Sequence, residues 1–122
     1  MKYNIPYVVN ELKPNAKFMF RGDLYDYSGL QWTDSVQTKP TETEVNIKIS
    51  ELDNAEAMRL LRIERDARIV KTDWRASSDL TLADAWKTYR QALRDLPASA
   101  TPKLNSEYEL DLTSVTWPTE PS

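Results

Sequence analysis

Two groups of carboxylates are the side chains in this sequence whose spacing suggests chemistry. Asp23 and Asp26 lie three residues apart, and Glu107, Glu109 and Asp111 alternate along a later segment. Paired carboxylates can act as general acid and base, and carboxylate oxygens bind hard cations. Neither group has the glycine and the later glutamate of a calcium-binding loop. We therefore interpret both as solvated charges of turns and strand edges, and we predict no catalytic and no metal-binding residue.

The residue types that are missing exclude further chemistry. The 122 residues include no His, no Cys and only two Gly. Without His or Cys there is no imidazole-activated nucleophile, no structural zinc site and no disulfide. Gly22 and Gly29 are isolated, so they cannot form a phosphate-binding loop. We expect a protein that is not an enzyme and that uses no cofactor.

The charge is mildly acidic, with 16 basic and 19 acidic residues and a formal net charge of −3. Residues 56–96 carry nine bases and seven acids, whereas residues 97–122 carry one base and four acids. This balance argues against nucleic acid as a partner. The first residues contain no long apolar run, so we expect no signal peptide, no membrane span and synthesis in the cytosol.

The elements that position these residues begin with a small β region over residues 1–38. Three short segments, residues 5–9, 17–20 and 30–33, are apolar enough to be strands. Both glycines fall between the second and third segments, where turns need positive φ. The pattern predicts a β-hairpin or a small meander.

A helical region is predicted over residues 39–97. Thr41 and Glu44 have the spacing of a capping box, which marks a helix start. At Asp53 and Asn54 the chain either caps a new helix or continues as one long helix, and the sequence favours neither. A last helix is expected to open at Thr81 and to stop at Pro97.

Residues 55–74 carry apolar residues at alternating spacings of three and four, which is a heptad pattern. We name this set the heptad stripe: Leu60, Ile63, Ala67, Val70 and Trp74. The last helix has a matching set: Leu82, Trp86, Tyr89, Leu93 and Leu96. Two matched stripes predict an antiparallel αα-hairpin whose core includes Trp74 and Trp86.

The fold class is therefore α+β, a β-hairpin or meander followed by helices that form an αα-hairpin. Residues 98–122 form an acidic segment in which polar and apolar residues alternate, which predicts either a short strand or an extended tail. We expect the three regions to form one compact unit.

A second apolar set on residues 55–74 lies across the helix from the heptad stripe. We name Met58, Leu61 and Ile69 the opposite stripe. Either the N-terminal region or the first helix covers it, or it faces another protein chain with nearby arginines as rim contacts. Aromatic residues near turns and at the C-terminus are further candidates for contact with a partner. The predicted partner-binding residues are Tyr25, Tyr27, Met58, Leu61, Arg62, Arg65, Ile69 and Trp117.

The second half of the chain also resembles a known family. An Arg-Asp pair precedes Asp73-Trp74, and a Trp-Pro pair lies near the C-terminus. Between them is the most specific block, Trp86-Lys87-Thr88-Tyr89-Arg90-Gln91-Ala92-Leu93-Arg94-Asp95-Leu96-Pro97. These motifs, over about residues 60–118, resemble the phage tail assembly chaperone family. Arg90 or Arg94 could bind Asp73 or the Pro97 loop and so fix the hairpin, or could contact the partner.

The resemblance implies a tail-fibre assembly chaperone or accessory protein that binds a tail-fibre or other tail structural protein without catalysis. The alternative is a permanent adaptor or tip protein of the fibre or baseplate. The resemblance also implies a location in the host cytoplasm during assembly, with retention in the virion tail under the alternative. The oligomeric state stays open.

Overall fold

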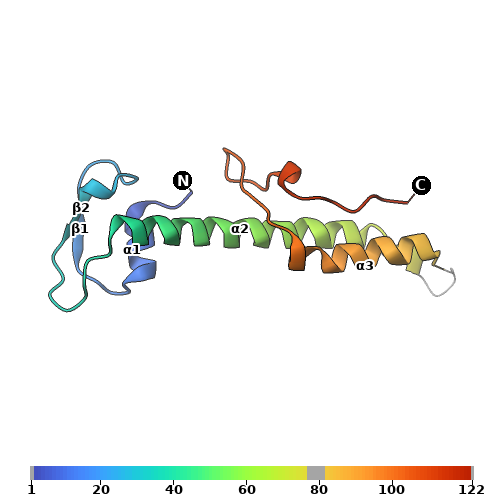
Figure 1. Ribbon diagram of the computed structural model, residues 1–122, viewed down its shortest axis with the longest axis horizontal. Helices are drawn as coiled ribbons and strands as arrows, with labels where there is room; N and C mark the ends of the chain where they lie inside the picture. Colours follow the sequence, from blue (N-terminus) through green and yellow to red (C-terminus); the bar gives the residue numbers. More distant parts are fainter. Residues whose placement is uncertain (1, 77–81, 122) are drawn as a thin grey trace. The chain divides into compact units, whose positions relative to one another are not determined.

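A computed structural model describes residues 2–76 and 82–121 of the chain. The chain folds into two compact units, residues 1–53, here unit 1, and residues 54–122, here unit 2. The main elements are α1 (Ile5–Leu12), β1 (Phe18–Phe20), β2 (Leu30–Trp32), α2 (Glu42–Val70) and α3 (Asp84–Ser99) (Figure 1). A two-stranded sheet followed by a helical hairpin confirms the α+β class. The predicted division at residues 38 and 97 stays a prediction.

Unit 1 begins with a helix where the sequence predicted a strand, so that prediction was wrong. The Asn4 side chain accepts a hydrogen bond from the Tyr7 amide at 2.9 Å and caps the helix, and Pro6 occupies its first turn. Ile5, Val8 and Val9 are all buried, at the i, i+3, i+4 spacing of a helix face. The cap and this spacing override the strand preference of the β-branched residues.

The predicted hairpin is confirmed, with β1 and β2 antiparallel and Phe18 opposite Trp32. Gly22 has a φ of 83°, as a turn glycine should. Gly29 was also expected to have positive φ. The structure instead requires glycine there because neighbouring atoms come close to its Cα. A Cβ at this position would collide with the Arg21 carbonyl oxygen and lie 2.8 Å from the Phe20 ring.

Helix α2 starts at the predicted capping box, because the Thr41 hydroxyl accepts the Glu44 amide proton at 3.1 Å. The helix then continues through Asp53 and Asn54, so the single long helix is the correct alternative. In unit 1, Val45 and Ile49 of α2 pack in one apolar cluster with α1 and β2.

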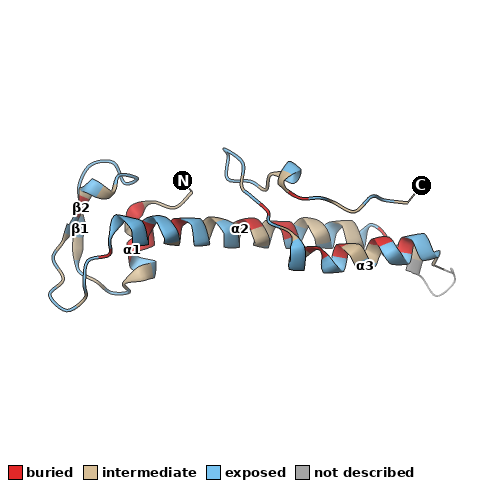
Figure 2. Cartoon of the chain, in the orientation of Figure 1, coloured by how far each residue is buried: buried red, intermediate tan, exposed pale blue. Residues whose placement is uncertain are grey.

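In unit 2, α3 runs beside the second part of α2 (Figure 1). Four of the five residues of its predicted stripe are buried, Trp86, Tyr89, Leu93 and Leu96. Leu82 precedes the helix and is half-buried. Buried and exposed residues alternate along both helices (Figure 2). The helix that packs against this face uses a different side from the one predicted, as described below.

Neither end of α3 lies where the sequence predicted it. Thr81 lies outside the described residues, but Leu82 and Ala83 are not helical and α3 begins at Asp84, which is later than expected. Pro97 was expected to stop the helix, but α3 continues to Ser99, and the Ala100 amide bonds to the Leu96 carbonyl at 3.0 Å. A proline removes one intrahelical hydrogen bond, and the last turn tolerates this loss because it has few bonds left to make.

The C-terminal segment is the extended alternative. Its only described bridge pairs Leu104 with Leu110, and a short 3-10 turn, η3 (Leu112–Ser114), follows. Val115 is buried against Leu61 and Leu96, and Trp117 packs beside them. The tail is therefore part of the core of unit 2.

Candidate partner-binding surface

Four residues of the heptad stripe lie on α2, and Trp74 lies in the 3-10 turn η2 (Asp73–Ala76) that follows it; all except Leu60 are exposed. Ile63, Val70 and Trp74 have 54%, 64% and 59% of their surface accessible. Ala67 is also exposed, and Leu60 is half-buried. The prediction that this stripe forms the helix–helix core was therefore wrong, as was the core position expected for Trp74. Exposed apolar residues that line one helix face are typical of a surface that binds another protein.

The opposite stripe forms the core instead. Leu61 is fully buried with Leu96 and Val115, and Met58 packs against this cluster. Ile69 packs against the neighbouring cluster of α3. The C-terminal tail and α3 cover this face, and neither had been considered as its cover from the sequence.

Arginine stems explain why the face with fewer apolar residues is the buried one. The side chain of Arg65 is 19% exposed and that of Arg68 is 27% exposed, although both are charged. Long arginine side chains can cover apolar surface with their methylene groups while the guanidinium reaches water. The Arg68 guanidinium also lies 4.0 Å from the centre of the Trp117 ring, at cation–π distance. An apolar count therefore underestimates how much of this face can be buried.

One arginine of α3 joins the two helices. The Arg90 guanidinium donates to the Thr72 hydroxyl at 2.5 Å and to the Asp73 carboxylate at 2.9 Å. The sequence expectation that Arg90 or Arg94 binds Asp73 is confirmed for Arg90. Thr72 is only 2% exposed and donates in turn to the Ile69 carbonyl. The network fixes the end of α2 against α3.

Charged side chains flank the heptad stripe on both sides. The charges directly before Leu60 and Ala67 are Arg59 and Asp66, and those directly after Ile63 and Val70 are Glu64 and Lys71. Arg59 bonds to Glu56 at 2.6 Å, Glu64 bonds to Arg68 at 3.0 Å, and Asp66 bonds to Arg65 at 2.7 Å. The side chains of Glu64 and Asp66 are 38% and 65% exposed, so each carboxylate can accept a further donor.

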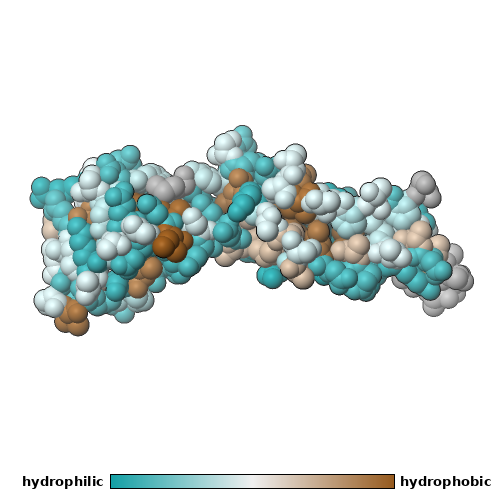
Figure 3. Space-filling view, viewed as in Figure 1, coloured by the Kyte–Doolittle hydropathy of each residue, from teal (hydrophilic) through white to brown (hydrophobic). Residues whose placement is uncertain are grey.

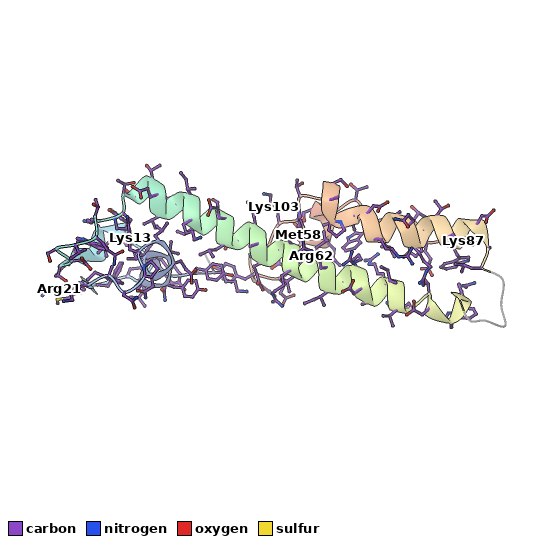
Figure 4. All side chains as sticks on the ribbon, turned by 90° about the horizontal axis from the view of Figure 1, so that it is seen from below. Lys13, Arg21, Met58, Arg62, Lys87 and Lys103 are labelled. Atoms are coloured by element: carbon purple, nitrogen blue, oxygen red, sulfur yellow. The ribbon has the colours of Figure 1, made fainter. Side chains whose placement is uncertain are left out.

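The predicted partner-binding residues fall into two sets. Met58 and Arg62 lie one turn apart on α2 (Figure 4), and Arg62 is exposed. Trp117 is half-buried and donates its indole N–H to the Leu112 carbonyl at 3.1 Å. Unit 2 thus brings together Met58, Leu61, Arg62, Arg65, Ile69 and Trp117. For the buried members the structure shows a packing role.

The two tyrosines of the set belong to unit 1. Tyr25 is 47% exposed. Tyr27 donates its hydroxyl proton to the Pro40 carbonyl at 2.6 Å and so ties the turn to the start of α2. Burial, together with the charges of Glu42 and Glu44, raises the pKa of the Tyr27 phenol above its ordinary value. Their contact with a partner stays a prediction.

Three of the five carboxylates considered for catalysis, Asp23, Asp26 and Asp111, accept hydrogen bonds that cap turns. Asp23 accepts the Tyr25 amide at 2.9 Å, and Asp26 accepts the amide and the hydroxyl of Ser28. These bonds lower the pKa of Asp26. Asp111 makes the same pair of bonds with Thr113. Over residues 2–76 and 82–121, no three acidic side chains gather as a metal-binding set.

Sequence reasoning missed Ile63, Val70 and Trp74 as surface candidates. The signal was present in the 3-4 spacing, but the stripe was assigned to the interior of the hairpin. On the face shown in Figure 3, hydrophobic residues form small separate patches on a mostly hydrophilic surface. Against such a surface, five apolar positions in one heptad pattern are distinctive.

Comparison with known proteins identifies the family of the second half of the chain. A family model described as phage tail assembly chaperone protein matches residues 58–122, which is more than half of the chain. This chain belongs to the phage tail assembly chaperone family. The family match begins four residues after the start of unit 2, so it covers the heptad stripe, α3 and the tail. Neither the curated proteins nor the solved structures include a significant match.

The family assigns the chain a role in assembling the phage tail. None of the helices in the described part of the chain has an apolar run long enough to span a bilayer.

Proposed function

We propose that this protein assists tail-fibre assembly by binding a tail-fibre subunit through the heptad stripe, without catalysis. The observation that carries the proposal is the exposure of Ile63, Val70 and Trp74 within the part of the chain that matches the family. A heptad pattern of apolar residues fits an amphipathic helix of the partner, which would lay its own apolar face on the stripe.

This binding would cover apolar surface of the fibre subunit until assembly is complete. A fibre subunit that assembles with other subunits exposes apolar surface until assembly is complete, and such surface aggregates. Binding to the heptad stripe removes apolar area from water on both proteins, and this burial drives association. The protein would then act in the host cytoplasm during tail assembly, with a tail structural protein and neither nucleic acid nor membrane as its partner.

Co-expression tests this function. The chain is produced together with the tail-fibre protein of the same phage, and the soluble yield of assembled fibre is measured. We expect a higher yield with the chain than without it. An unchanged yield, with no complex on size-exclusion chromatography, would overturn the proposal.

A matched pair of variants tests the surface. Ile63→Asp places a charge on the heptad stripe, and Ile47→Asp places the same charge on α2 within unit 1. The two isoleucines are similarly exposed, at 54% and 56%. We expect Ile63→Asp to abolish the gain in fibre yield and Ile47→Asp to retain it, with equal thermal stability of the two variants. An equal gain in fibre yield with both variants would exclude the heptad stripe as the binding surface.

A permanent place in the virion makes a different prediction. Mass spectrometry of purified particles would then detect the chain in a fixed ratio to the fibre. We expect it to be absent, since a chaperone is released when assembly is complete.

A further inference from the structure

We infer that in the absence of a tail protein the heptad stripe is covered by a second copy of this chain, with the two α2 helices parallel and in register. The inference deepens the proposed function, because the tail protein would replace the second copy on the same surface. Self-association itself does not depend on a tail protein and can be tested alone.

The apolar positions are those of a two-stranded coiled coil. Leu60 and Ala67 occupy one core position of the heptad, a, and Ile63 and Val70 occupy the other, d. All four lie within α2, which is helical to Val70. The Lys71 amide still bonds to the Ala67 carbonyl at 3.2 Å, so the helical geometry extends one residue further.

The charges beside the heptad stripe indicate that the molecule bound there is a second copy of this chain. In a parallel, in-register pair, a residue at heptad position g faces the residue five positions later, at e, on the other helix, and these pairs set partner and orientation. Position g is Arg59 and then Asp66, and position e is Glu64 and then Lys71. The chain therefore pairs Arg59 with Glu64 and Asp66 with Lys71 of its copy. Both pairs are attractive, so the pattern is complementary to itself.

These charges are accessible to a second copy. The side chain of Asp66 is 65% exposed and that of Glu64 is 38% exposed. Lys71 is exposed, and the Arg59 side chain is 59% exposed. Glu64 and Lys71 border the face that packs on α3, since both line a pocket with Tyr89. The buried residues Leu61 and Thr72 lie at other positions of the helical heptad. A second copy can thus approach without disturbing the core.

The stripe is short, which predicts a weak and reversible dimer. Leu60 and Val70 are about 15 Å apart at 1.5 Å per residue. A contact this short buries little surface area, and small interfaces are typical of transient complexes. Weak self-association suits a surface that must exchange a second copy for a tail protein.

Analytical ultracentrifugation of the full chain over a range of concentrations tests self-association. We expect a monomer–dimer equilibrium whose dissociation constant rises at least about tenfold in Ile63→Asp, and is unchanged in Ile47→Asp. A chain that stays monomeric at millimolar concentration overturns the inference. So does a dimer that Ile63→Asp leaves intact.

Charge exchange and cross-linking test the orientation. Lys71→Glu should weaken the dimer, and adding Asp66→Lys to it should restore the affinity. Since the chain has no cysteine, Val70→Cys introduces a single thiol. We expect oxidation to link two copies through residue 70, because equivalent d positions meet only in the parallel, in-register pair. Ile47→Cys is the control and should not cross-link.

Absence of the Val70→Cys link in a protein that dimerises overturns the parallel register. Exchange is tested on the same variant. The oxidised dimer should not bind the tail-fibre protein, and reduction should restore binding. If the reduced protein does not bind the fibre, the proposed function fails while the dimer stands. If the oxidised dimer binds the tail-fibre protein as well as the reduced protein does, the second copy and the tail-fibre protein do not share the heptad stripe.

Discussion

The Arg90 side chain ties α3 to the end of α2 and to the residues that follow it. Its guanidinium reaches the buried Thr72 hydroxyl and the Asp73 carboxylate, and it is 11% exposed. Hydrogen bonds to a charged group are stronger than neutral ones, and without Arg90 the buried Thr72 hydroxyl keeps only the bond that it donates to the Ile69 carbonyl. Arg94, one turn later, is exposed and reaches only Gln91 at 3.4 Å.

Arg90→Ala should therefore lower the free energy of unfolding by about 1–3 kcal/mol. Arg94→Ala is the matched control and should change it by less than about 0.5 kcal/mol. Urea denaturation followed by circular dichroism measures both. Similar values for the two variants would show that the Arg90 contacts contribute no net stability.

Asp34 holds together the loop that follows β2. Its carboxylate accepts the amides of Gln37, Val36 and Lys17, at 2.7 to 2.9 Å. The Gln37, Lys17 and Val36 bonds hold the pKa of Asp34 below its ordinary value of 3.8. Because the pKa is lower in the folded state, this carboxylate stabilises the fold above pH 3.8, and the contribution is lost as pH falls through the folded pKa.

In Asp34→Asn the amide oxygen can still accept bonds but no longer titrates in this range. We expect the loss of stability below about pH 4 to be less steep in Asp34→Asn than in the wild type. Thermal unfolding at a series of pH values from neutral to acid gives the comparison. Parallel acid limbs for the two proteins would contradict the role of Asp34.

At the scale of elements, α2 carries two apolar stripes and buries only one. Leu61 is fully buried, and its neighbour Leu60, about 100° around the helix, is half-buried on the heptad stripe. The two residues are chemically identical and adjacent, so they form an internal control for which face is the core.

Leu61→Ala should cost about 2–5 kcal/mol of unfolding free energy, because it leaves a cavity among Leu96, Val115 and Met58. Leu60→Ala should cost less than about 1 kcal/mol. Chemical denaturation of both variants decides the matter. A larger loss for Leu60→Ala would mean that the heptad stripe is the core after all.

The sequence predicted the elements better than their contacts. The Thr41 capping box, the hairpin strands and the α3 stripe were recognised because each has a local signature. Helix α1 was missed because β-branched residues favour strands, while its cap at Asn4 was decisive. The buried side of α2 could not be read from apolar periodicity, since arginine stems supply part of its apolar surface and both α3 and the tail cover it.

At the scale of the whole chain, α2 contributes to two compact units, and its middle belongs to the core of neither. Ile49 is the last buried residue of α2 in unit 1, and Ala57 is the first in unit 2. Residues 50–56 between them are exposed or half-buried. Leu52 packs at the edge of the unit 1 cluster, but no side chain of this stretch is buried in a core, so its helical amides have little support besides their backbone bonds.

We therefore expect hydrogen exchange to be faster at residues 50–56 than at residues 45–49 and 57–69. Exchange measured by NMR on the full chain would report each amide. Uniform protection along the whole of α2 would indicate that the helix opens as a single cooperative element.

The separation of the two stripes of α2 also has a consequence for how such a protein can change over time. Substitutions at Ile63 or Val70 alter a surface whose residues are not needed for the core, while Leu61 and Ile69 are constrained by packing. Under the proposed function, the heptad stripe can therefore diverge to follow a changing tail protein while the fold is maintained. Adaptation to a new fibre would then require a few substitutions on one helix face and no compensating changes in the core.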